Sequence, residues 1–247
     1  MQNPRNISLS GKTVLITGGA IRIGRSLALA VAQAGGDVVV HYGNSRKEAK
    51  RLQTEIEAAG RKAFILQADL ADATQVTELI SRAWEQAPLF ALVNNASVFE
   101  SLGWENTSLE DWNRTMMVNL STPFLLSQAF ARFLEPGSDG RIVNLMDWRA
   151  LRPGADHLPY TISNSALAAL TRSLAIALAP RITVNGLALG AILPPSDGGS
   201  AKVNLEQVPA RRWANLEEVG QALVFLLDGP AYITGEILHV DGGRHLV

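Results

Sequence analysis

The sequence predicts an α/β protein with one doubly wound parallel sheet of about seven strands. Short apolar runs alternate with longer amphipathic stretches along the whole chain. Each short run is rich in β-branched residues and apolar at consecutive positions, which is typical of a strand covered on both faces. No stretch has the composition of a linker between domains. Strand, helix and strand in repeated succession give parallel strands joined by right-handed crossovers, which is the Rossmann-type arrangement.

The expected strands follow one another at intervals that leave room for a helix. They lie at residues 13–17 (TVLIT), 38–41 (VVVH), 63–67 (AFILQ), 91–94 (ALVN), 142–145 (IVNL), 182–187 (ITVNGL) and 236–240 (EILHV). Helices are expected at residues 24–34, 46–59, 73–86, 160–178 and 216–227, with a long helical region over 109–133. Residues 1–10 are expected to form an N-terminal tail and residues 11–247 a single domain, because 47% hydrophobic residues suffice for one large core.

Composition and charge exclude several classes of function. The 22 basic and 23 acidic residues leave a net charge of −1, which disfavours nucleic-acid binding and attachment to an anionic membrane surface. No apolar run reaches the roughly 18 residues that span a bilayer, and the first residues lack the apolar stretch of a secretory signal. Without cysteine, and with four scattered histidines, no metal site is expected. A cytoplasmic protein is the expectation.

A glycine-rich loop joins the first expected strand to the first expected helix. It reads Thr17-Gly18-Gly19-Ala20-Ile21-Arg22-Ile23-Gly24. Glycines permit a tight turn and close backbone approach, and the following helix N-terminus offers N–H groups and a positive dipole to a pyrophosphate. The loop alone would also fit an ordinary strand-to-helix turn; its position in an α/β pattern favours dinucleotide binding.

From residue 11 to residue 247 the chain resembles the short-chain dehydrogenases/reductases. The marks that carry the resemblance occur in the family's order: the glycine loop, Asp69-Leu70, Asn94-Asn95-Ala96-Ser97, Asn119, Tyr160, Val184-Asn185-Gly186 and Asp241-Gly242-Gly243. Within the family it is most similar to pteridine reductases. That similarity rests on Arg22 in place of a middle glycine, on His41-Tyr42 followed by Ser45, and on Asn95-Ala96-Ser97-Val98-Phe99.

The residues after the second strand indicate NADPH as the cofactor. Enzymes that prefer NAD usually place a carboxylate there to bind the ribose hydroxyls, but no acidic residue precedes Glu48. Asn44 and Ser45, together with Arg22, are instead suited to a 2′-phosphate. By resemblance, Asp69 lies near the adenine, although a turn or cap ahead of residues 71–73 explains it equally well. The resemblance also implies that Thr17, Gly18, Ile23, Gly24, Asn95, Ala96, Ser97, Gly190 and Ile192 bind the cofactor.

The resemblance implies a proton-donating tyrosine, and Tyr160 occupies that position. Family members carry a lysine four residues later, on the same helical face, but Asn164 stands there in this chain. An amide can bind ribose hydroxyls, yet it supplies no positive charge. The sequence therefore allows a slowed enzyme, an enzyme with a rearranged acid, or a protein that binds the cofactor without catalysis. A lysine restored at position 164 is expected to raise turnover.

Four further residues complete the expected site. Asp147 stands thirteen residues before Tyr160, where most members have serine and pteridine reductases have aspartate. In a dry pocket its pKa should rise, so that it could deliver a proton; a strand-end cap is the alternative. Asn119 is expected in the proton relay by resemblance. Phe99 and Trp148 are expected against the substrate, although Phe99 could equally be a core residue.

Three further expectations concern the loop after the sixth strand, the oligomeric state and the function. Residues 190–200 form the one long loop and are a lid candidate, with Leu189-Gly190 replacing the family's Pro-Gly. The chain is expected to be a homo-oligomer, a tetramer or dimer, on the basis of the resemblance. The favoured function is NADPH-dependent reduction of a pteridine-like or other small cyclic or carbonyl substrate. The alternative is a non-catalytic NADP(H)-binding relative that acts as a sensor or an assembly partner.

Overall fold

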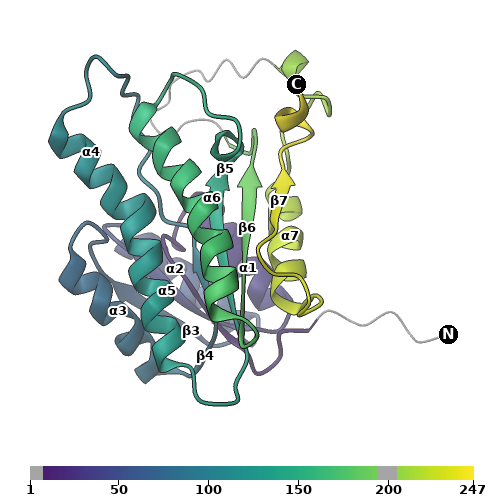
Figure 1. Ribbon diagram of the computed structural model, residues 1–247. Coiled ribbons are helices and arrows are strands. Elements are labelled where there is room, and N and C mark those ends of the chain that lie inside the picture. The colour runs from purple at the N-terminus through teal and green to yellow at the C-terminus, as the bar shows by residue number, and fades with distance from the viewer. Residues whose placement is uncertain (1–7, 194–204) are drawn as a thin grey trace.

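A seven-stranded parallel sheet forms the centre of the molecule (Figure 1). The computed structural model describes residues 8–193 and 205–247. In the order β3-β2-β1-β4-β5-β6-β7, every neighbouring pair is parallel. The strands are β1 (Thr13–Ile16), β2 (Asp37–Tyr42), β3 (Ala63–Gln67), β4 (Leu89–Asn94), β5 (Gly140–Asp147), β6 (Ile182–Leu189) and β7 (Ile237–Val240). This confirms the predicted Rossmann-type fold class.

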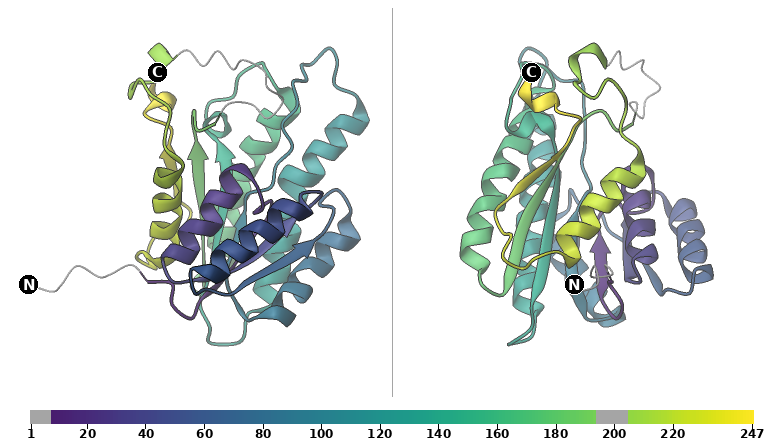
Figure 2. Two further views of the ribbon diagram at one scale, coloured as in Figure 1. Left: turned by 180° about the vertical axis from the view of Figure 1, so that it is seen from behind. Right: turned by 90° about the vertical axis from the view of Figure 1, so that its right-hand side faces the viewer.

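Helices cover both faces of the sheet, as Figure 2 shows from behind and from the side. One layer contains α1 (Arg22–Gln33), α2 (Arg46–Ala58) and α7 (Leu216–Asp228), and the other contains α3 (Ala73–Gln86), α5 (Thr122–Phe133) and α6 (Leu158–Leu178). The short α4 (Leu109–Met116) packs on α6 beyond the sheet. No helix of the described residues is long and apolar enough to cross a membrane.

Each helical layer buries its own apolar core against one face of the sheet. Alternate residues of β1 enter opposite cores: Val14 and Ile16 pack toward α1 and α7, and Leu15 packs toward α3 and α5. This alternation explains why three consecutive residues of the strand, Val14 to Ile16, are apolar. Leu9, expected in the N-terminal tail, is fully buried in the first core and donates its N–H to the Ala34 carbonyl. The packed domain therefore includes Leu9.

The long helix expected over 109–133 is interrupted by a π-helical turn at Met117–Ser121. Pro123 stands at the start of α5 and has no N–H, so it cannot make the α-helical bond to the residue-119 carbonyl. The N–H of Thr122 bonds to the Met117 carbonyl, one residue further back than in an α-helix. Single π turns of this kind are frequent at functional sites. Here the turn holds Asn119, which is buried.

The carboxyl ends of the strands meet at one edge, at the top of Figure 1. The strand order reverses between β1 and β4, since β2 lies on one side of β1 and β4 on the other. Ligands of open α/β sheets bind in the crevice outside the carboxyl ends at such a switch point. The segments that follow β1, β4, β5 and β6 all begin at this edge, and they carry most of the site residues expected from the sequence.

Candidate functional site

The glycine loop after β1 is shaped by close backbone contacts. Gly18 has a φ of +60°, in the left-handed region that glycine adopts without a steric cost. A Cβ added to Gly24 would lie 2.1 Å from the carbonyl oxygen of Gly18, so no other residue fits there. In the described chain no side chain caps the N-terminus of α1, and its first turn contains no acidic residue. The free N–H groups and the helix dipole favour an anion at this point.

Thr17 and Asn95 tie the glycine loop to the segment after β4. The Thr17 hydroxyl accepts hydrogen bonds from the backbone N–H groups of Asn95, at 2.9 Å, and Ala96, at 3.0 Å. In return, the Asn95 amide donates to the carbonyl oxygens of Thr17, at 2.8 Å, and Gly18, at 3.2 Å. The structure thus brings together the expected cofactor residues of β1 and β4. Ile23 packs beside them against the first core.

His41 holds the same loop from β2, a role that the sequence analysis did not assign. Its Nδ1 accepts the N–H of Gly18 at 3.0 Å, and its Nε2 lies 3.1 Å from the carbonyl oxygen of Ala68. Since Nδ1 is the acceptor, the proton resides on Nε2. Burial lowers the pKa of His41 to about 4, so the ring is neutral at neutral pH. The one sequence feature that could have indicated this role is the position of His41 near the end of β2, next to the glycine loop.

The residues expected at the 2′-phosphate lie on the surface beside this loop. Arg22, the first residue of α1, has a φ of +53° and is exposed. Asn44 is exposed and Ser45 half-buried in the turn before α2, where the Ser45 hydroxyl does not cap the helix. Asp69 forms a turn by accepting the N–H of Ala71 at 2.9 Å, whereas the cap of α3 is Asp72. Asp69 therefore forms the turn that the sequence allowed, and its own carboxylate is exposed to solvent.

The proton-transfer residues converge where β5 meets the start of α6. Asn164 is 4% exposed, and its Oδ1 accepts the backbone N–H of Asp147 at 2.8 Å. Its Nδ2 donates to the backbone carbonyl of Tyr160 at 2.9 Å. The amide therefore joins the last residue of β5 to the first turn of α6. Asn164 fixes the positions of both Asp147 and Tyr160, which was not foreseen from the sequence.

Burial controls the titration of Tyr160 and Asp147. The pKa of the Tyr160 phenol is raised by burial and then by the charge of Asp147, while the charge of Arg149 and the amide of Asn164 oppose the rise. The pKa of Asp147 is also raised by burial, against hydrogen bonds and charge from Arg149. Both groups therefore favour their protonated forms, as residues that deliver a proton should.

Phe99 lies beside Tyr160 and His157 at this site. Its ring is in edge contact with Tyr160, with centroids 4.7 Å apart, and is stacked on His157 at 4.3 Å. Phe99 is 48% exposed, so the interpretation as a core phenylalanine is wrong. His157 is held by its Nδ1, which lies 2.9 Å from the Glu100 carbonyl oxygen. A half-exposed aromatic ring next to the Tyr160 phenol suits a flat ring.

Asn119 uses its side chain to fix the segment that carries Phe99. Its Oδ1 accepts the N–H of Val98 at 2.9 Å, and its Nδ2 donates to the Val98 carbonyl at 3.0 Å and to the Ser163 hydroxyl at 3.1 Å. The side chain therefore connects the segment after β4 to α6. Ser97, expected at the cofactor, is exposed beside it. Trp148 follows Asp147, and the guanidinium groups of Arg149 and Arg244 lie over its ring.

The ends of β6 and β7 approach each other at Gly190. A Cβ there would lie 2.6 Å from the Cα of Asp241, which explains glycine at this position. Ile192 is buried in the first core, and the Ala191 carbonyl accepts the N–H of Ala214. The lid candidate continues past residue 193 into 194–200, which lie outside the described residues.

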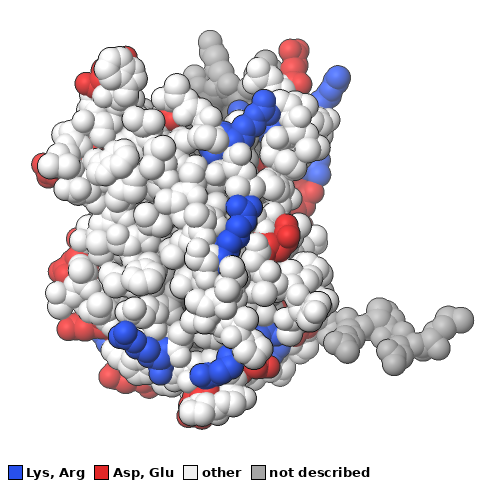
Figure 3. Space-filling view, in the orientation of Figure 1, with Lys and Arg blue, Asp and Glu red and all other residues white. Residues whose placement is uncertain are grey.

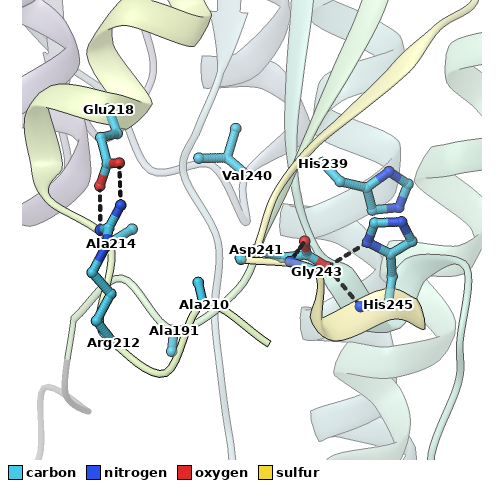
Figure 4. A pocket seen from close by; sticks show the side chains of 11 residues that line it. Ala191, Ala210, Arg212, Ala214, Glu218, His239, Val240, Asp241, Gly243 and His245 are labelled. Carbon is cyan, nitrogen blue, oxygen red and sulfur yellow. Dashed lines mark hydrogen bonds and ion pairs between the residues drawn. The ribbon is translucent and has the colours of Figure 1, made fainter. Parts of the chain in front are cut away.

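A pocket of about 310 Å³ opens beyond these strand ends (Figure 4). One wall carries the Arg212–Glu218 ion pair and the other the stacked rings of His239 and His245, whose centroids are 3.8 Å apart. The Nδ1 of His245 lies 2.8 Å from Asp241. Burial would raise the pKa of Asp241, but hydrogen bonds from His245 and its neighbours lower it. The described residues contain no cluster suited to a metal ion.

Comparison with known proteins shows the family. A family model described as enoyl-(acyl carrier protein) reductase matches residues 19–245. The chain belongs to this family, a branch of the short-chain dehydrogenases/reductases. It is 32% identical over 241 residues to the 3-oxoacyl-[acyl-carrier-protein] reductase of Synechocystis, with 96% of this chain and 98% of the relative covered.

Two solved structures that resemble the chain contain NADP. FolM alternative dihydrofolate reductase 1 from Brucella canis, complexed with NADP, has a TM-score of 0.90 and 34% identity, covering 97% of this chain and 96% of its own. A short-chain dehydrogenase from Burkholderia cenocepacia in complex with NADP has a TM-score of 0.89 and 35% identity, with 96% and 98% covered.

Proposed function

We propose that the protein is an NADP(H)-dependent reductase that acts on a pteridine-like or similar flat cyclic substrate. The observation that carries the proposal is the half-exposed ring of Phe99 in edge contact with Tyr160, a proton donor that has Asp147 beside it. A flat ring on Phe99 would have its carbonyl or imine next to a proton donor. Likeness to an NADP complex of an alternative dihydrofolate reductase supports the same substrate class.

The residues around β1 suit NADP(H). The uncapped N-terminus of α1, with its free backbone N–H groups and positive dipole, fits a pyrophosphate. No carboxylate lies between the end of β2 and Glu48, and Arg22 with Asn44 and Ser45 can donate to a 2′-phosphate. Asp69, Ser97, Ala96, Gly190 and Ile192 complete the proposed cofactor contacts.

Bound NADPH supplies a hydride to the substrate carbon, and the chain supplies the proton. Tyr160 holds that proton at its phenolic oxygen and donates it to the substrate oxygen or nitrogen. Asp147, whose pKa burial raises, then returns a proton to Tyr160. Asn164 holds both residues in place through their backbones. Asn119 holds Val98 and thereby the position of Phe99. Trp148 is proposed to border the substrate.

Turnover tests this function directly. NADPH oxidation is measured at 340 nm against pterins, dihydrofolate, quinones and simple ketones, with cofactor affinity measured separately by nicotinamide fluorescence. We expect oxidation with a pterin or dihydrofolate, and its loss in Tyr160→Phe with NADPH affinity retained. Normal NADPH binding without oxidation of any substrate would reject the reductase and favour a non-catalytic NADP(H)-binding protein.

The surface over α5 and α6 suits self-association. Figure 3 shows that this face is largely free of charged side chains. Ile176 on α6 is 81% exposed, and Phe124 on α5 is also exposed. A homotetramer or dimer that pairs these helices would cover both side chains. Sedimentation of the natural protein and of Ile176→Glu tests this; a monomer in the natural protein would contradict it.

A further inference from the structure

Arg149 reaches the proton-transfer site from the turn that follows β5. Asp147 ends β5 and begins the short 3₁₀ turn Trp148–Ala150. One carboxylate oxygen of Asp147, Oδ1, accepts the backbone N–H of Arg149 at 2.9 Å, and the guanidinium Nη1 lies 3.4 Å from the same oxygen. The main chain and the side chain of Arg149 therefore both face the carboxylate.

The guanidinium is fixed at its other end as well. Its Nη2 lies 3.0 Å from Oδ2 of Asp156, and the group lies over the ring of Trp148, 5.2 Å from the centroid. The side chain of Arg149 is 19% exposed, so solvent screens its charge only partly. An arginine held by two carboxylates and an aromatic face loses little further freedom when charge develops nearby.

The other charged groups around Asp147 do not replace Arg149. Arg244, from the C-terminal turn, lies over Trp148 at 4.5 Å from the ring centroid and makes no direct ion pair with Asp147 among the described residues. His157 faces Asp156 at 3.9 Å, and Tyr160 is the group that the site must ionise. On α6, position 164 carries an uncharged amide bound to two backbone groups.

We infer that Arg149 is the positioning residue that supplies the positive charge of the proton-transfer site, from the turn after β5 instead of from α6. This inference rests on the proposed reductase function. When the Tyr160 O–H bond breaks, its proton goes to the substrate heteroatom and the electron pair stays on the phenolic oxygen. Asp147 then protonates that oxygen and becomes a carboxylate, which Arg149 pairs; water restores the Asp147 proton.

Three variants separate this role from simple packing. Arg149→Gln removes the charge, Arg149→Lys keeps it, and Arg152→Gln removes an exposed arginine from the same loop as the control. The titration of Asp147 is followed by ¹³C NMR of labelled aspartate carboxyls, assigned with Asp147→Asn. Binding of NADPH verifies that each variant is folded. The kcat for the best substrate is measured across pH.

An opposite charge at this distance lowers a carboxyl pKa by about 1–3 units, so Arg149→Gln should raise the Asp147 pKa by that amount. Its kcat should fall at least roughly tenfold, with its high-pH decline moved to higher pH, because a preorganised charge at the developing anion is lost. Arg149→Lys should restore most of the natural Asp147 pKa and of the natural kcat. Arg152→Gln should match the natural protein in both.

An unchanged Asp147 pKa in Arg149→Gln would overturn the inference, and so would an unchanged kcat in an active enzyme. If none of the substrates tested causes the natural protein to oxidise NADPH, the proposed function fails, and the catalytic part of the inference fails with it. The carboxyl titration still decides separately whether Arg149 sets the charge at Asp147.

Discussion

Replacement of Asn164 tests how the site is held together. In Asn164→Leu, a side chain of similar size, the Asp147 N–H loses its acceptor and the Tyr160 carbonyl loses one donor. The Tyr160 carbonyl still accepts a hydrogen bond from the Ser163 hydroxyl at 2.8 Å, so losing the Asn164 donor costs it little stability. Among the described residues, no other side chain accepts a hydrogen bond from the Asp147 N–H. An unpaired buried N–H costs about 1–3 kcal/mol, and this one is only part-buried, so about 1–2 kcal/mol is expected.

Urea unfolding measures that loss, and a neighbouring serine provides the control. The Ser165 hydroxyl is buried without a hydrogen-bond partner in the described part of the chain, so Ser165→Ala should not destabilise the protein. Lysine is a donor only and cannot replace the lost acceptor. Asn164→Lys should therefore lose about as much stability as Asn164→Leu. Its turnover is a separate quantity, which the added charge is expected to raise. If Asn164→Leu unfolds at the same urea concentration as Ser165→Ala, Asn164 does not hold the site.

Three other residues give independent predictions. His41 titrates at about 4 when folded and at about 6.5 when unfolded, so the unfolded chain binds more protons between these values. Stability should fall by about 3 kcal/mol as pH drops from 6.5 to 4, and His41→Asn should flatten that decline in urea unfolding; an equally steep decline would contradict it. Arg22→Gly should narrow the preference for NADPH over NADH, expected to be at least roughly tenfold, because each charge-assisted bond contributes about 1.5–3 kcal/mol. An equal preference for NADPH in Arg22→Gly and in the natural protein would contradict the proposed contact. Phe99→Ala should weaken binding of flat substrates by roughly tenfold with NADPH affinity unchanged, because stacking contributes about 0.5–1.5 kcal/mol beyond buried area. A loss of stability approaching the ~3–5 kcal/mol of a core phenylalanine would contradict the exposed position.

The sequence was most informative where local pattern determines structure. Strands covered on both faces are apolar at consecutive positions, and all seven were recognised; β3 and α3 have the predicted bounds. The end of β5 was placed at Leu145, two residues too early, because Met146 and Asp147 pair only with β6. The π turn at Met117–Ser121 was missed, because a single turn of five residues is too short to change the hydrophobic pattern of the helix around it.

The site could be predicted only as far as the family's motifs reach. Tyr160 and Asp147 were predicted from the family's motif, and the structure places their side chains together. His41, Arg149 and the backbone bonds of Asn164 act through contacts between segments distant in the sequence or around a turn. No periodicity or spacing encodes such contacts, so they required the fold.

Transfer of isotope from the cofactor tests the central claim most directly. The protein is incubated with NADPH carrying deuterium at both C4 positions and with a pterin or dihydrofolate, and the product is analysed by mass spectrometry. If the chain is an NADP(H)-dependent reductase with Tyr160 as the proton donor, the reduced product carries one deuterium, and Tyr160→Phe yields little of it. A product without deuterium, or no product despite bound NADPH, would contradict the proposed function.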